Sequence, residues 1–390
     1  MLALAPVLAG CGSQADPASE AEVPAGAPVK IGYLASLSGF CAAAAREYVA
    51  GAELAVRVLD ARGGVDGHRL QLIVRDDRAT PSVGVEQARA LIGEDHVKFL
   101  AGTCSSAVGE SVARSVADPS HVVYAAGVAD PSAFAGGPEV YAFGTIPTTT
   151  IEGQSAAAYV RAHPSWKRIA IVSEDYSYGR QVTAAFARAL AGSGQRIVNV
   201  QYLPSGASDY VPYIERLLAA RPDAIYSTAI EGDAVRLVAQ GLPLGLFAPA
   251  RGFLGVMDYR TLARMPRPPL GVEGYTCYPS ATIYRTPEAR ELLSLGQPLA
   301  DGGAAGDAFN QIELIAQGIA KARSTDPARV RDALSGGSVA LVQGTVRVRA
   351  CDHVAATPIA MGPVVGPSPG LPYPRLEPVA LIGTGGGWGC

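Results

Sequence analysis

Short apolar runs alternate along this chain with longer segments in which apolar residues recur at every third or fourth position. The first apolar run covers residues 29–35, and the helical spacing follows at residues 43–61. A second run at residues 69–77 precedes a second helical segment at residues 81–92. Because strands that alternate with helices form βαβ units, this pattern predicts an α/β fold with a parallel sheet.

The same order begins again after residue 144, which predicts two similar α/β lobes. The second set comprises strands at residues 168–174, 196–203 and 223–229, with helices that end near residues 190 and 220. The further elements expected are helices at residues 233–240, 308–322 and 326–334, and strands at residues 251–254, 271–278, 345–349, 358–365 and 375–382.

One strand–turn–helix stretch carries the clearest candidate for ligand binding. An apolar strand stops at Gly102, a turn with Ser105 and Ser106 follows, and a helix begins near Ala107. The first turn of a helix leaves backbone N–H groups unpaired, and the helix dipole adds partial positive charge there. These groups together favour a carboxylate. The alternative is that Ser105 or Ser106 only caps the helix.

Ligands of open parallel α/β sheets bind beyond the carboxyl ends of the strands. Two facing lobes would therefore enclose a cleft between six turns. The turns at residues 36–41, 103–106 and 127–130 would lie on one side, and those at residues 175–178, 230–233 and 253–258 on the other.

Composition narrows the class of protein. The chain has 390 residues, of which 48% are hydrophobic and 17% charged, so two or three domains with a sizeable core are expected. The net charge of −3 argues against a nucleic-acid partner. There is no G-x-S-x-G, Walker or H-E-x-x-H motif and no C-x-x-C pair, so we expect neither an enzyme nor a metal or cofactor site. The glycine-rich residues 383–390 are interpreted as a flexible tail.

The N-terminus looks like the end of an export signal. Residues 1–10 are apolar or small and precede Cys11, which resembles a bacterial lipoprotein box with Cys11 as the lipidated residue. No Lys or Arg precedes the apolar run, so the true start is expected upstream of Met1, or the segment is only a frayed apolar end. Residues 12–28 have the composition of a tether. We therefore expect an exported lipoprotein, in the periplasm or on the cell surface.

Several motifs in fixed order carry a resemblance to a known family. They are IGYLASLSG, GAELAVRVLDARGGVDGHRLQLIVRDD, LAGTCSSAVGE, EDYSYGR and FNQIELIAQGIAKARSTDPARVRDAL, which lie between residues 31 and 334. Over residues 29–382 the chain resembles the periplasmic substrate-binding proteins of the leucine/isoleucine/valine-binding family. These proteins capture an amino acid or related small ligand and deliver it to the permease of an ABC transporter.

The resemblance implies a Venus-flytrap of two Rossmann-like lobes that close on the ligand. The three crossing strands are expected at residues 141–147, 273–279 and 339–345. Lobe 1 would comprise residues 29–144 and 279–340, and lobe 2 residues 145–278 and 341–382. A monomer is expected. A sensor of the same fold, which signals to a membrane partner, is the alternative function.

The family's ligand residues carry over one by one. Ser105 and Ser106 match the loop that binds the ligand carboxylate, and Tyr178 matches a tyrosine that covers the ligand from lobe 2. Val128 and Ala129 match a second loop, where Ala129 lacks the threonine hydroxyl often found there. The expected ligand-binding residues are Phe40, Ser105, Ser106, Val128, Ala129, Tyr178, Glu231 and Leu254.

The chain departs from the amino-acid binders at one of these positions. The acid that would hold the ligand ammonium falls at Leu254, and Glu231 and Asp258 are the candidate replacements. A buried ammonium without a counter-ion costs roughly several kcal/mol. An amino acid, an aromatic acid, an amide or another small carboxylate therefore all stay open as the ligand.

The resemblance also guides the cysteine pairing in an oxidising compartment. Cys104 matches one half of the family's disulfide in lobe 1, but its usual partner position falls at about Ala79. We therefore expect Cys41 to pair with Cys104. Cys277 and Cys351 are expected to form a second pair, which leaves Cys390 unpaired.

Overall fold

The computed structural model describes residues 22–39, 41–296, 299–301, 303–355 and 357–383. The expectations for the leader with Cys11, for most of the tether, for Phe40 and for Cys390 lie outside these residues. No helix in the described part of the chain is long and apolar enough to cross a membrane.

The first lobe, lobe 1, is built on a parallel five-stranded sheet in the order β2-β1-β3-β4-β5. Its strands are β1 (Val29–Ala35), β2 (Leu70–Asp76), β3 (Phe99–Gly102), β4 (Val123–Ala126) and β5 (Ala142–Gly144). β3 and β4 are buried throughout, as expected of strands covered on both faces.

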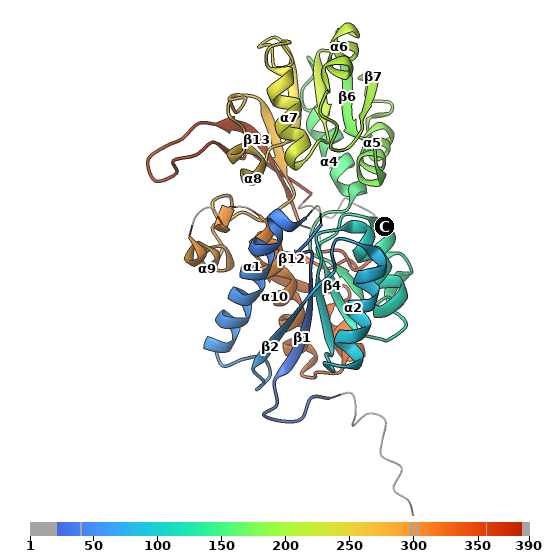
Figure 1. Ribbon diagram of the computed structural model, residues 1–390, viewed down its shortest axis with the longest axis vertical. Helices are drawn as coiled ribbons and strands as arrows, with labels where there is room; N and C mark the ends of the chain where they lie inside the picture. The colour runs from blue at the N-terminus through green and yellow to red at the C-terminus, as the bar shows by residue number, and fades with distance from the viewer. Residues whose placement is uncertain (1–21, 40, 297–298, 302, 356, 384–390) are drawn as a thin grey trace, which may run out of the picture.

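Helices cover both faces of this sheet (Figure 1). On one face lie the long helices α1 (Ala42–Ala61) and α10 (Ala304–Ala322), with α11 (Pro327–Leu334) beside α10. The other face is covered by α2 (Pro81–Gly93) and by α3 (Ser106–Val112), which continues as a π-helical turn at Ala113–Ala117. α9 (Pro287–Leu292) packs beside α1.

The second lobe, lobe 2, has a larger mixed sheet in the order β14-β13-β10-β9-β8-β6-β7, with β15 paired to β13. Five of its strands run parallel: β6 (Arg168–Glu174), β7 (Arg196–Leu203), β8 (Ala224–Ser227), β9 (Gly252–Val256) and β10 (Glu273–Thr276). The antiparallel strands are β13 (Ile359–Val365), β14 (Arg375–Leu376) and β15 (Ala380–Ile382).

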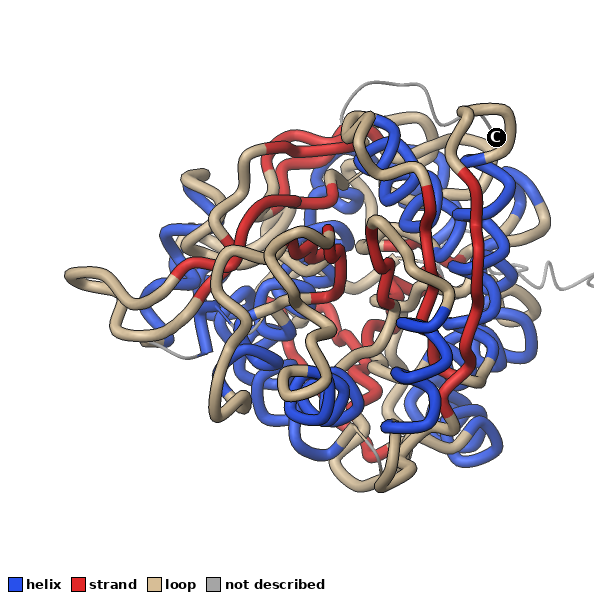
Figure 2. Tube along the Cα trace, turned by 90° about the horizontal axis from the view of Figure 1, so that it is seen from above, coloured by secondary structure: helices blue, strands red, loops and turns tan. Residues whose placement is uncertain are grey.

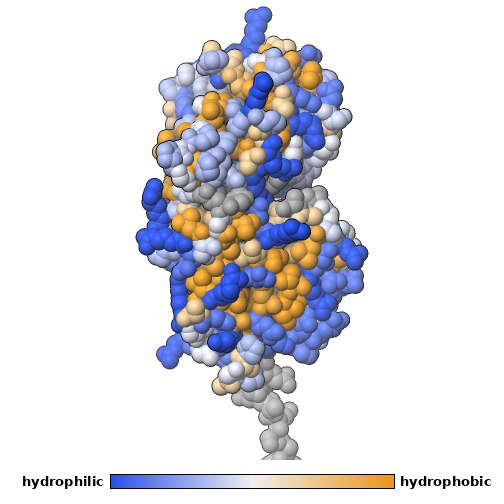
Figure 3. Space-filling view, turned by 60° about the vertical axis from the view of Figure 1, so that its left-hand side comes forward, coloured by the Kyte–Doolittle hydropathy of each residue, from blue (hydrophilic) through white to orange (hydrophobic). Residues whose placement is uncertain are grey.

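Helices flank this sheet too, and Figure 2 shows them on both sides of the strands. α4 (Thr149–Arg161) and α5 (Ser177–Leu190) share one core, and α6 (Val211–Ala219), α7 (Glu231–Gly241) and α8 (Tyr259–Ala263) share another. Figure 3 shows the two lobes joined at a narrower waist. Two α/β lobes with parallel central strands, as the sequence predicted, are thereby confirmed.

The third connection between the lobes differs from the prediction. Instead of crossing at residues 339–345, the chain forms an antiparallel hairpin of β11 (Ser338–Leu341) and β12 (Gly344–Arg347). The hairpin packs against α10 in the core of lobe 1, and the next strand, β13, belongs to the sheet of lobe 2. The turn is allowed by Gly344, whose φ is +106°. The other lobe boundaries stay a prediction.

Candidate functional site

The turn that contains the two serines begins where strand β3 ends. Position 102 requires glycine, because its φ is +102° and a Cβ atom would lie 2.0 Å from the Leu34 carbonyl oxygen. Ser105 occupies the N-cap position of α3, yet its side chain makes no capping hydrogen bond. Ser105 is buried and Ser106 is half-buried. The capping interpretation therefore leaves the Ser105 hydroxyl unexplained.

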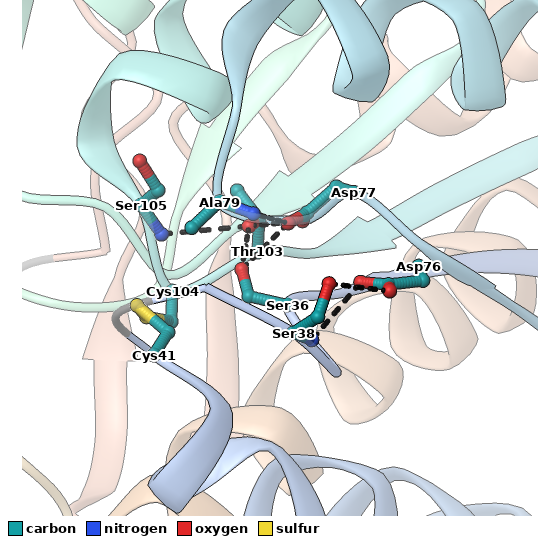
Figure 4. Close-up of a disulfide and its surroundings, with 9 residues drawn as sticks. All are labelled: Ser36, Ser38, Cys41, Asp76, Asp77, Ala79, Thr103, Cys104 and Ser105. Atoms are coloured by element: carbon teal, nitrogen blue, oxygen red, sulfur yellow. Dashed lines mark hydrogen bonds between the residues drawn. A yellow bond between two sulfur atoms is a disulfide. The ribbon is translucent and has the colours of Figure 1, made fainter.

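A buried carboxylate, Asp77, holds this turn to the end of β1. Its Oδ1 accepts hydrogen bonds from the Ser36 hydroxyl at 2.6 Å and from the Ala79 N–H at 2.7 Å, and its Oδ2 accepts from the Thr103 hydroxyl. Asp77 is fully buried. A buried carboxylate needs such donors, so it fixes the two hydroxyls as donors toward itself. Figure 4 shows this network beside Ser105.

A disulfide with little exposed surface joins the same two turns. Cys41 and Cys104 are bonded, with their Cα atoms 6.4 Å apart (Figure 4). This confirms the expected pairing, with Cys41 in place of the partner near Ala79. The first and second turns of lobe 1 are thus linked both by Asp77 and by a covalent bond.

The second predicted disulfide is wrong. Cys277 is a free thiol, and Cys351 is disulfide-bonded but not to Cys277. The reason is the displaced third crossing, which keeps Cys351 in lobe 1 just after the β11–β12 hairpin. Cys277 instead follows β10 at the second crossing.

The third turn of lobe 1 is held from beneath by α10. Asp307 accepts from the Thr145 hydroxyl at 2.7 Å and from the Gln311 side-chain amide at 3.0 Å, and Gln311 Oε1 accepts from the Gly102 N–H at 2.9 Å. Gly127 packs directly against Asp307 and Gln311, because a Cβ atom at position 127 would be 1.9 Å from Asp307 Oδ2. Burial raises the pKa of Asp307 to about 7.

The sequence did not single out Asp307, and the helix containing it was expected to begin only at residue 308. Val128 and Ala129 are both buried in the turn that Asp307 supports. The Ala129 carbonyl oxygen already accepts the Thr149 N–H at 2.8 Å, at the start of α4 in lobe 2. Next to it, Asp130 Oδ2 accepts from the Gln181 side chain of lobe 2 at 3.1 Å. This turn is therefore a contact between the lobes.

Two tyrosines mark the start of α5 in lobe 2. Tyr176 is 39% exposed, Tyr178 is half-buried, and their ring centroids are 5.8 Å apart. The Tyr178 hydroxyl donates to Glu152 Oε1 at 2.7 Å. Glu152, on α4, is almost completely buried and was not predicted as a site residue. The role of Tyr178 as a cover for the ligand stays a prediction.

Leu254 does not lie in the cleft, which corrects the expectation for that position. It is in the middle of β9, paired with Tyr226 and Glu273, and has no exposed surface. β9 ends at Val256, so the residues at the cleft end of this strand are Met257 and Asp258. The sequence analysis ended this strand at residue 254, two residues before its end in the structure.

The two candidate replacements for the missing acid differ in how they are placed. Asp258 is buried, and its Oδ1 caps α8 by accepting the Thr261 N–H at 2.8 Å. Its Oδ2 lies 4.0 Å from the Arg260 guanidinium, so both oxygens already have partners within lobe 2. Glu231 begins α7, and its side chain lies outside the described residues.

Comparison with known proteins agrees with this architecture. The family model described as periplasmic binding protein matches residues 28–367. Leu/Ile/Val-binding protein homolog 3 of Brucella melitensis is 28% identical over 323 residues, which are 80% of this chain and 84% of the relative.

Two solved structures share the fold over almost the whole chain. An amino acid ABC transporter substrate-binding protein from Pseudomonas fluorescens superposes with a TM-score of 0.79 at 18% identity, over 90% of this chain and 95% of that chain. A solute-binding protein of an ABC transporter from R. palustris, in complex with 4-hydroxybenzoate, has a TM-score of 0.80 at 19% identity, over 93% and 98%. The chain therefore belongs to the periplasmic binding protein family and is a solute-binding protein rather than an enzyme.

Proposed function

We propose that this protein captures a small carboxylate in the cleft between its lobes and delivers it to the permease of an ABC transporter. The observation that carries the proposal is the turn at residues 103–106. It is tied to its neighbour by Asp77 and by the Cys41–Cys104 disulfide, and its Ser105 hydroxyl does not cap α3. A preorganised turn with hydroxyl and N–H donors suits a carboxylate.

We further propose that the ligand lacks an α-ammonium group. Asp77, Asp130 and Asp258 all use their carboxylate oxygens within the protein. Leu254 is in the core. An ammonium in the cleft would thus lack a counter-ion among these four positions, at a cost of roughly several kcal/mol. An aromatic acid, such as the 4-hydroxybenzoate bound by the R. palustris protein, meets no such penalty.

Delivery to the permease requires that closure depend on the ligand. The lobes already meet through Thr149 and Ala129 and through Gln181 and Asp130, close to the first crossing. A ligand that contacts both lobes would add to these contacts and shift the population toward the closed form. Export as a monomeric lipoprotein, lipidated at Cys11, is part of the same proposal.

A thermal-shift screen of the chain from residue 22 tests the ligand class. The panel holds leucine, isoleucine, valine, benzoate, 4-hydroxybenzoate, benzamide and small dicarboxylates. A ligand at 100 times its Kd stabilises the folded state by about 2.7 kcal/mol. We expect a rise in Tm with the aromatic acids. A rise with leucine, isoleucine or valine alone would refute the ligand class, and no rise with any compound would refute the binding role.

A further inference from the structure

A second buried carboxylate, Glu152, lies under the lobe 2 side of the cleft. It is in the first turn of α4 and only 1% exposed. Its Oε1 accepts two hydrogen bonds of 2.7 Å, one from the hydroxyl of Tyr178 on α5 and one from the hydroxyl of Tyr275 on β10. Its Oε2 has no hydrogen-bond partner within the part of the chain that the structure describes. Three elements of lobe 2 thus converge on one oxygen atom.

This arrangement commits the only proton of the Tyr178 hydroxyl. A phenol has one O–H donor, and an ionised carboxylate can only accept. Burial raises the pKa of Glu152, so its neutral form has to be considered as well. In that neutral form a proton on Oε1 would itself be donated to one of the two tyrosine oxygens, because Oε2 has no partner within the described residues. Tyr178 therefore donates to Glu152 whenever this carboxylate is ionised.

We infer that Glu152 sets the hydrogen-bonding direction of Tyr178, so that this hydroxyl accepts a hydrogen bond from the ligand and does not donate one. The remaining lone pairs of the Tyr178 oxygen are its only free hydrogen-bonding capacity. A ligand hydroxyl next to the Tyr178 oxygen can donate a hydrogen bond to it. A carbonyl or carboxylate oxygen in the same place is repelled by the lone pairs of the Tyr178 oxygen. Glu152 is thus a positioning residue that determines specificity without touching the ligand.

The inference deepens the proposed function and rests on it. If the ligand carboxylate lies at the turn of Ser105 and Tyr178 covers the ligand from lobe 2, as the proposed function has them, the opposite end of the ligand faces Tyr178. The protein then selects a molecule with an acceptor group at one end and a donor at the other. An aromatic acid with a distal hydroxyl group has this form, and a symmetric dicarboxylate does not.

The test compares two acids of similar size in calorimetric titrations of the full chain. 4-Hydroxybenzoate has a distal donor, and 4-formylbenzoate has a distal acceptor only. We expect the first to bind at least about tenfold more tightly, the preference that roughly one hydrogen bond of ordinary strength supplies.

Three substitutions separate a directional role from a purely structural one. Glu152→Gln keeps an acceptor oxygen for the two tyrosines, so the preference is expected to stay within about twofold of that of the wild type. Glu152→Met releases the Tyr178 proton, and Tyr178→Phe removes the hydroxyl; both are expected to reduce the preference to less than about threefold. Equal loss in Glu152→Gln and Glu152→Met would overturn the inference, as would an unchanged preference in Glu152→Met.

A matched control exists in the same lobe. Tyr159 donates to Glu273 Oε2 at 2.8 Å in a second tyrosine–carboxylate pair. Glu273→Met removes that bond and is expected to leave the ligand preference unchanged. This variant therefore controls for any general loss of stability that follows when a buried tyrosine–carboxylate bond is removed.

A measurement without ligand distinguishes a failure of the proposed ligand class from a failure of the inference about Tyr178. In protein labelled with 13C at the tyrosine ζ carbons, we expect a slowly exchanging Tyr178 hydroxyl proton in the wild type and in Glu152→Gln, but not in Glu152→Met. If neither 4-hydroxybenzoate nor 4-formylbenzoate binds while this proton is observed, the proposed ligand class fails and the direction of Tyr178 stands. If the acids bind and the proton exchanges rapidly in the wild type, the inference fails alone.

Discussion

The side-chain oxygen of Gln311 lies 2.9 Å from the backbone nitrogen of Gly102 and accepts its N–H. Helix α10 thereby holds the end of strand β3, from which the turn with Ser105 begins. Gln311 also donates to Asp307, which in turn accepts from Thr145 at the first crossing between the lobes. One helix therefore supports the candidate ligand turn and a connection to lobe 2.

Asp77 is expected to matter more for the site than an exposed acid. In Asp77→Asn one of the two carboxylate acceptors becomes an amide donor, which then faces the hydroxyl of either Ser36 or Thr103 in place of the acceptor it needs. We expect a loss of about 1–3 kcal/mol in the free energy of unfolding and weaker ligand binding. Urea denaturation and calorimetric titration measure the two effects. Asp332→Asn, at an exposed acid beside Arg331, is the control and should change neither; equal effects of the two substitutions would contradict the role of Asp77.

The buried carboxyl group of Asp307 should make the free energy of unfolding depend on pH. Its pKa is raised from 3.8 to about 7 in the folded protein by burial, so between these values the folded state holds a proton that the unfolded chain has released. The free energy of unfolding must then decrease as the pH rises through this window.

Asp307→Asn removes that contribution. Urea denaturation at pH 5 and pH 8 should show a smaller decrease in the substituted protein than in the wild type. Parallel pH dependences in the two proteins would show that Asp307 titrates near its ordinary pKa.

The Cys41–Cys104 disulfide is expected to stabilise the fold and the site together. It closes a separation of 63 residues, and a disulfide of this kind contributes typically about 2–4 kcal/mol. The double substitution Cys41→Ser with Cys104→Ser should lower Tm and weaken ligand binding. Cys277→Ser changes a free thiol at the second crossing and should lower Tm much less. A double substitution that lowers Tm but leaves affinity intact would mean that the disulfide does not order the turn.

Gly127 is expected to tolerate no side chain. The Cβ of Gly127→Ala would lie 1.9 Å from Asp307 Oδ2 and 2.4 Å from the Gln311 side-chain nitrogen, so the pair has to move. Overpacking of this kind costs typically about 1–3 kcal/mol, and here it also disturbs the turn with Val128. Gly93→Ala, where a Cβ has open space at the end of α2, should be within about 1 kcal/mol of the wild type. Similar denaturation curves for the two substituted proteins would contradict the close packing.

The periodicity of apolar residues predicted most elements of the fold. It did so because parallel strands and amphipathic helices both bury apolar side chains, each with its own spacing along the chain. It also placed Ser105 at a strand–helix turn. The helix expected at residues 326–334 is α11, and the side chain of Asp326 caps it by accepting the Ala328 and Arg329 N–H groups.

Contacts between distant segments were not accessible in the same way. Asp307 and Gly127 are far apart in sequence, and no local pattern marks a carboxylate that the fold will bury. Leu254 illustrates the same limit, since the end of β9 is set by its pairing with β8 and β10. The hairpin at residues 338–347 was misread because the alternation of Val339 and Leu341 fits a crossing strand equally well.

The proposed function requires that the turn with Ser105 bind the carboxylate of a ligand without an α-ammonium group. Calorimetric titration of 4-hydroxybenzoate and of leucine, into the wild type and into Ser105→Ala, tests it most directly. We predict that 4-hydroxybenzoate binds, that leucine does not, and that Ser105→Ala weakens the binding by about tenfold. Binding of leucine without 4-hydroxybenzoate, or an unchanged affinity in Ser105→Ala, would contradict the account.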